Sequence, residues 1–150
     1  MKVNGGLTDT ERDALERLAG CLIPPDKSDE GIRGAGFAGI IELRNMYQPL
    51  AANLYRAGLA GCEEACHALF GRSLYEATED EVGAVLAAIA EGTAAGESWT
   101  DACGPQEFFS TLRADACFVY CTSEDVWKRI GFPGPSFNLG GYPDYSDPQA

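Results

Sequence analysis

Histidine is almost absent from this chain of 150 residues, and basic side chains are scarce. His67 is the only histidine, which excludes motifs that need two, such as the helical histidine pair of zinc proteases. Lysine and arginine number 11 against 23 acidic residues, so the net charge is −12. This charge opposes binding to nucleic-acid phosphates and to anionic lipid, and we expect no nucleic-acid partner.

Long apolar runs are also missing. None approaches the roughly 18 to 20 residues that span a bilayer, so we expect no direct membrane insertion. The opening residues show neither a secretory nor a twin-arginine signal. We therefore expect a cytoplasmic protein, or a periplasmic one if a signal was removed or is supplied by a partner. The length predicts a single domain whose core needs no metal or disulfide.

Helical spacing of apolar residues dominates the chain, and no convincing pair of strands appears. Thr8 with Glu11, and Thr78 with Glu81, each form a capping box, which predicts helices that start near residues 9 and 79. Further helices are predicted from Phe37, after a break at Pro49, from Pro105 and, with Ser123 as the cap, up to a stop at Gly131.

These segments predict an all-α fold, a bundle or array of about five to six helices over residues 1–130. Residues 131–150 are expected to form an irregular, extended C-terminal arm of the same domain. The polar stretch Asp26–Gly36 reads as a loop, and Gly58 and Gly61 weaken the predicted continuity of the helix that follows Pro49.

The C-terminal arm combines helix-breaking residues with large aromatics. Its glycines and prolines rule out a regular helix or a central strand. Its aromatic side chains carry more apolar surface than a solvated tail should expose. The arm should therefore either fold back over its own domain or wrap a partner. For Trp127 and Phe132 we keep both possibilities open.

Six cysteines raise a second hypothesis, in which the protein is metal- or redox-active. Cys62 with Cys66, and Cys117 with Cys121, would each place two sulfurs one turn apart on a helix, as a four-thiolate zinc site between two helices would require. Both pairs lie inside amphipathic patterns, so we prefer the interpretation that these cysteines act as small apolar residues of a helical core. An inter-helix disulfide, including one with Cys21 or Cys103, is a further alternative.

Other motifs point to structure rather than chemistry. Cys66 and His67 are adjacent on a predicted helix and would point about 100° apart, so a nucleophile dyad is not expected. The glycines of GAGFAG, residues 34–39, have dinucleotide-site spacing, but no strand precedes them, so we interpret them as a turn into a helix. The acidic residues are interpreted as solvated helix faces.

Several segments, taken in order, resemble the gluconate 2-dehydrogenase subunit 3 family, the small subunits of flavin dehydrogenases. They are LTDTERDALERLAGCLIPPD (7–26), GAGFAGIIEL (34–43), SLYEATEDEVGAVLAAI (73–89), FFSTLR (108–113) and GFPGPSFNLGGY (131–142). The resemblance implies a helical, non-catalytic small subunit of a hetero-oligomer. Its partner would be a large flavoprotein of the glucose-methanol-choline (GMC) type that oxidises a sugar or alcohol. It also implies that FAD belongs to the partner and that this chain holds no cofactor.

The arm is the part of the chain that we expect to contact this partner. The anchoring residues predicted in the arm and just before it are Trp127, Phe132, Pro133, Pro135, Phe137, Tyr142 and Tyr145. A further possibility is that the chain completes the substrate channel of the partner and so affects its specificity.

Overall fold

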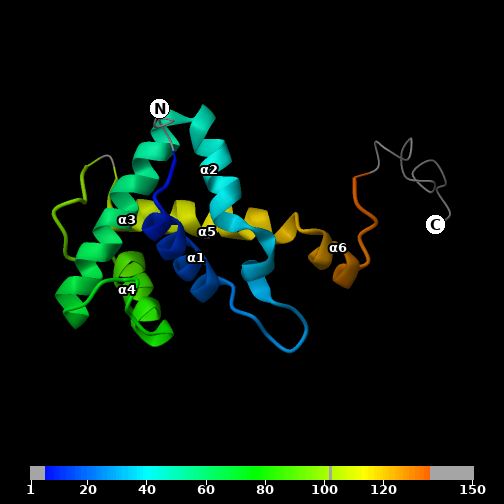
Figure 1. Cartoon of the computed structure of the whole chain (residues 1–150), viewed down its shortest axis with the longest axis horizontal. Helices are drawn as coiled ribbons and strands as arrows, with labels where there is room; N and C mark the ends of the chain where they lie inside the picture. Colours follow the sequence, from blue (N-terminus) through cyan, green and yellow to red (C-terminus); the bar gives the residue numbers. More distant parts are fainter. Residues whose placement is uncertain (1–5, 102, 136–150) are drawn as a thin grey trace.

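The computed structural model describes residues 6–101 and 103–135, and this part of the chain is built from helices (Figure 1). No strand occurs in these two ranges, where the sole β-bridge joins Thr100 to Cys103. The all-α prediction and the predicted five to six helices are confirmed. The elements are α1 (Asp9–Leu22), the 3₁₀ helix η1 (Gly31–Ala35), α2 (Phe37–Tyr47), α3 (Pro49–Phe70), α4 (Glu79–Glu91), α5 (Pro105–Cys121) and α6 (Glu124–Ile130).

Both predicted capping boxes are present and fix the starts of α1 and α4. The Thr8 amide donates to Glu11 at 2.7 Å, and the Glu11 amide donates to the Thr8 hydroxyl oxygen at 3.2 Å. The pair at Thr78 and Glu81 has the same two distances. Two backbone N–H groups that would lack a partner at each helix start are thereby satisfied, as the sequence predicted.

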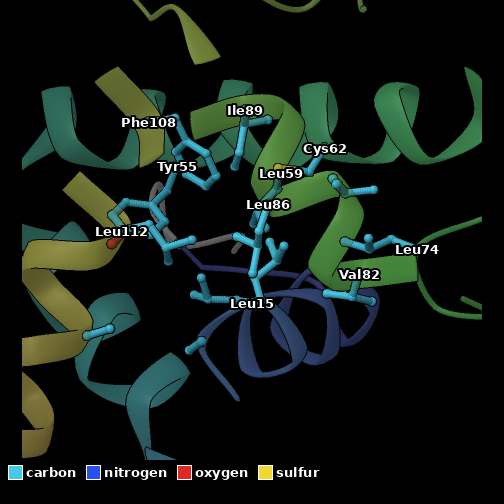
Figure 2. Close-up of a cluster of buried hydrophobic side chains, with 14 of the residues drawn as sticks. Leu15, Tyr55, Leu59, Cys62, Leu74, Val82, Leu86, Ile89, Phe108 and Leu112 are labelled. Atoms are coloured by element: carbon cyan, nitrogen blue, oxygen red, sulfur yellow. The ribbon is translucent and has the colours of Figure 1, made fainter. Parts of the chain in front are cut away.

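The core lies where α1, α3, α4 and α5 meet (Figure 2). Leu15 from α1, Val82 from α4 and Leu112 from α5 have no exposed surface, and Tyr55 and Cys62 from α3 are equally buried. Helix α2 and η1 pack against α1 and α5 and close the remaining sides. Burial of many such side chains at about 25 cal/mol per Å² provides the main stabilisation of the bundle.

Helix α3 runs without interruption through Gly58 and Gly61, so the weakened continuity predicted from these glycines is wrong. A Cβ at Gly58 would lie 2.1 Å from the Phe108 ring, and one at Gly61 would lie 2.4 Å from the Trp99 ring. Both glycines let an aromatic ring touch the helix backbone. The packing of these rings offsets the low helix propensity of glycine.

The predicted loop over residues 26–36 is correct only in part, because it contains η1. Ile32 is completely buried, and its amide donates to the Ile23 carbonyl oxygen at 3.1 Å. Gly36 ends η1 with a φ of +66° and leads directly into α2. The interpretation of GAGFAG as a turn into a helix is thus confirmed.

Helix α6 lies at the C-terminal end of α5, well away from α4 (Figure 1). It stops at Gly131, whose φ of +73° is the left-handed conformation expected of a C-terminal glycine. Ser123 is the N-cap, as predicted, but its hydroxyl donates to the Tyr120 carbonyl oxygen instead of capping the helix. Residues 132–135 have no regular secondary structure.

Candidate functional site

The described part of the arm is held against the end of α6 by Trp127. The indole N–H donates to the Cys121 carbonyl oxygen at 2.9 Å. The Phe132 ring packs edge-on against Trp127, with ring centroids 5.4 Å apart and planes at 81°. The Phe132 amide also donates to the Trp127 carbonyl oxygen at 2.8 Å. The two aromatics therefore form one ordered unit.

This unit borders a hollow of about 360 Å³ that opens to solvent. Its lining comes from α6 and the arm: Glu124, Trp127, Lys128, Phe132, Pro133, Gly134 and Pro135. The structure thus brings together four of the seven predicted interface residues, Trp127, Phe132, Pro133 and Pro135. We call these four the arm cluster. The other three, Phe137, Tyr142 and Tyr145, lie outside the described residues.

Asp29 ties α6 to the loop before η1. Its carboxylate accepts a hydrogen bond from the Tyr120 hydroxyl at 2.5 Å and forms an ion pair with Arg129. The Arg129 guanidinium also lies over the Tyr120 ring, 5.7 Å from its centroid. A seven-residue helix is marginal in isolation, so these contacts hold α6, and with it the arm cluster, in place.

The loop that carries Asp29 is ordered by Asp26. The Asp26 carboxylate accepts from the Ser28 hydroxyl at 2.5 Å and from the Ser28 amide at 2.6 Å. These hydrogen bonds stabilise the charged form and lower the pKa of Asp26. The acidic residues of this region therefore position the chain, which the sequence-based interpretation of solvated helix faces missed.

Arg44, Tyr55 and Asp115 form a second polar cluster, between α2, α3 and α5. Asp115 accepts from the Tyr55 hydroxyl at 2.6 Å and from Arg44 at 2.6 Å. The pKa of Tyr55 is raised, mainly by burial and to a smaller extent by the hydrogen bond to Asp115. The tyrosine stays protonated and acts as a donor, so the cluster joins three helices.

The four-thiolate zinc site is not formed. All six cysteines are free thiols, and no group of three or more metal-ligating side chains occurs among the described residues. Cys62 and Cys66 are buried in the core, whereas Cys117 and Cys121 are exposed on α5. Burial raises the pKa of Cys62 and of Cys66, which disfavours the thiolate that metals and nucleophilic chemistry require.

The adjacent Cys66 and His67 do not form a dyad either, because the thiol is buried and the imidazole side chain is exposed. Another hollow, of about 530 Å³, lies between α1 and α4 beside Cys21. Its arginines are already bound within the chain. Arg33 pairs with Glu79, and Arg17 donates to two backbone carbonyl groups.

Sequence reasoning missed one apolar surface, the solvent-facing side of α2. Its residues are Gly39, Ile40, Leu43, Met46 and Tyr47, all exposed, and we call it the α2 outer face. The sequence could have indicated this surface, because the helix carries only two charged residues, Glu42 and Arg44, and therefore has no continuous polar face.

The described chain is a small all-α domain with apolar surface open to solvent at the arm cluster and on α2. It belongs to the gluconate 2-dehydrogenase subunit 3 family, whose model matches residues 9–134. The resemblance identified from the sequence is thereby confirmed over most of the chain. Members of this family are subunits of an oxidoreductase complex, which implies a partner subunit. No curated protein and no solved structure matches the chain significantly.

Proposed function

We propose that this chain is a non-catalytic small subunit that binds and stabilises a large FAD-dependent GMC-type oxidoreductase. The partner would oxidise a CH–OH group of a sugar or alcohol and would hold the FAD. The observation that carries the proposal is the arm cluster, an ordered aromatic and proline surface beside an open hollow. Because the family is one of complex subunits, such a surface suits a partner chain.

The residues of this chain do not fit a dinucleotide site of the usual kind. Its glycine motif joins η1 to α2, and no strand stands before it in the described residues. The proposal therefore assigns FAD to the partner. Redox chemistry at the cysteine pairs is the alternative, and burial with a raised pKa argues against it at the pair Cys62 and Cys66.

Binding alone is sufficient for a stabilising role. A subunit that binds the native flavoprotein, and not its unfolded chain, adds RT ln(1 + [L]/Kd) to the stability of the flavoprotein. This contribution is about 2.7 kcal/mol when the free subunit is at 100 times its Kd. Loss of the small subunit should thus lower the yield of soluble flavoprotein without any change in its active site.

Co-expression with the GMC-type flavoproteins of the source genome tests the proposal. We expect this chain to co-elute with a protein that absorbs in the flavin band, and expect less soluble flavoprotein in its absence. A colourless protein that elutes alone from every such co-expression would refute the proposed function.

Point variants then test the arm cluster. Phe132→Ser should weaken the complex by at least about tenfold, as expected for a central aromatic anchor. Tyr75→Ser is the matched control, since Tyr75 is an exposed aromatic outside the arm. Equal affinities of the two variants would remove the arm cluster from the interface.

Truncation after Ile130 separates the two roles considered for Trp127 and Phe132. A chain that keeps its helical signal but no longer pairs with the flavoprotein supports an arm that binds the partner. A chain that loses its helical signal shows instead that these aromatics stabilise their own bundle.

A further inference from the structure

Helix α2 is apolar on two opposite sides. Its inner side is buried and carries Phe37, Ala38 and Ile41, which pack in the core. The α2 outer face points to solvent, with Leu43 59% and Tyr47 79% exposed. A helix that is apolar all round is normally buried on all sides. Among the residues that the structure describes, α2 is covered on one side alone.

The two charged residues of α2 lie at the borders of the outer face and are both paired within the chain. Glu42 forms an ion pair with Arg12 at 2.7 Å and accepts from the Leu7 amide at 3.1 Å. Arg44 pairs with Asp115 at 2.6 Å. Both charges form ion pairs that hold α2 on the bundle. A partner that covers the outer face would therefore not bury an unpaired charge.

Gly39 lies in the first turn of α2, at the N-terminal end of this surface. A Cβ placed there would meet no atom within 4 Å, in contrast to Gly58, which packs against Phe108. Glycine within a helix costs about 1 kcal/mol relative to alanine. Because Gly39 carries no side chain, the backbone or a flat side chain of another protein could approach the helix closely at this position.

The surface is large enough for a specific contact. Leu50, 86% exposed, follows α2 closely in the chain, in the first turn of α3. At roughly 200 Å² for a large side chain, the exposed parts of Leu50 and of the α2 outer face amount to about 600 Å². That matches the largest apolar patches of ordinary monomers, which are often functional, and approaches the about 800 Å² per partner of a standard interface.

Charge distinguishes the possible occupants. Of the 23 acidic residues, only Glu42 falls between residues 37 and 62, so the surface lies in the least acidic part of the sequence. A second copy would bring a net charge of −12 against another −12. A membrane surface is disfavoured as well, because an interfacial helix normally carries a lysine- and arginine-rich polar face. A different protein chain is the remaining class.

We propose that the α2 outer face, together with Leu50, is a docking surface for an apolar, sparsely charged area of the flavoprotein subunit. This inference rests on the proposed function and adds a second contact to the one at the arm cluster. The flavoprotein would approach closest at Gly39, with Leu43 and Tyr47 buried against it.

The test compares matched variants of the full chain for affinity to the purified flavoprotein by biolayer interferometry. Leu43→Lys is matched by Leu69→Lys, because Leu69 is 53% exposed near the opposite end of α3. Gly39→Leu is matched by Gly83→Leu, because a Cβ at Gly83 also meets nothing within 4 Å. Circular dichroism verifies that all four variants fold.

We expect the Kd to rise at least about tenfold for the two α2 variants and to stay within about twofold for their controls. Equal affinities of Leu43→Lys and Leu69→Lys would overturn the docking surface while leaving the proposed function intact. Failure of the wild-type chain to bind any flavoprotein would remove the proposed function and this inference together. A wild-type dimer in light scattering that Leu43→Lys makes monomeric would assign the surface to a second copy.

Discussion

Substitution of Gly58 by alanine should destabilise the fold, although alanine is the better helix former. The added Cβ would lie 2.1 Å from Cδ2 of Phe108, about 1.4 Å short of a normal carbon contact. Phe108 is fully buried and cannot move freely. Its ring packs edge-on against Tyr55, with ring centroids 5.7 Å apart, and at a tilt against Trp99, with ring centroids 6.3 Å apart. Overpacking of this kind costs about 1–3 kcal/mol.

The measurement is urea unfolding followed by far-UV circular dichroism, with Gly83→Ala as the control. At Gly83 the new methyl group has open space, so the helix propensity gain of up to about 1 kcal/mol should appear in full. The same propensity gain applies to Gly58→Ala and cancels in the comparison, so relative to that control we expect Gly58→Ala to lower the free energy of unfolding by the overpacking cost alone, about 1–3 kcal/mol.

A double-mutant cycle identifies the cause. If the clash with the ring is responsible, Phe108→Leu should cost at least about 1 kcal/mol less in the Gly58→Ala background than in the wild type. Equal stability of Gly58→Ala and Gly83→Ala, or additive effects in the cycle, would refute the reasoning about ring-to-backbone packing in α3.

Three further perturbations test other parts of the structure. Asn45→Leu should raise the free energy of unfolding by about 1–3 kcal/mol, because the buried Asn45 amide lacks any hydrogen-bond partner in the described structure; a loss in urea unfolding would contradict this. Burial holds the pKa of Cys62 above its value in the unfolded chain. Below about pH 8.5 the thiol is protonated in both states, and as the pH rises further the unfolded chain loses the proton first, so the free energy of unfolding falls. Cys62→Ala should therefore reduce the alkaline slope of stability by up to about 1.4 kcal/mol per pH unit, and an unchanged slope would argue against a buried thiol. Asp29→Asn should free α6 by weakening the contacts of Arg129 and Tyr120, and should alter tryptophan fluorescence while leaving far-UV circular dichroism nearly constant.

Local signals in the sequence predicted much of the fold. Thr8 and Thr78 start helices through contacts only three residues long, and Gly131 ends one through its own backbone conformation. Such features depend on neighbours in sequence, so a reader of the sequence can find them. Gly58 gave the wrong indication because its role depends on Phe108, 50 positions away. Helix propensity is a property of the glycine alone, whereas the contact with Phe108 arises only from tertiary packing.

The sequence also drew attention to residues of the arm cluster, whose role as an interface stays a prediction. Trp127 and Phe132 stood out because aromatics beside glycine and proline need a surface to cover. The contacts of Asp29 with Arg129 and Tyr120 were not visible, because about 100 residues separate the aspartate from the arginine. The α2 outer face was overlooked for another reason. A period of 3.6 residues reveals one apolar side of a helix, and a helix with two such sides shows no clear period.

Polar contacts within this acidic chain bear on which exposed residues are free to bind a partner. Many of its carboxylates are already engaged within the molecule. Glu63 accepts a hydrogen bond from the Leu74 amide, and Glu64 accepts one from the Ser98 amide. Glu42 and Asp115 form ion pairs with arginines. These groups connect helices and loops, so their hydrogen-bonding capacity is already in use. Large apolar side chains on α2 and in the arm cluster are among those that remain exposed to water, and their burial against another surface would be favourable.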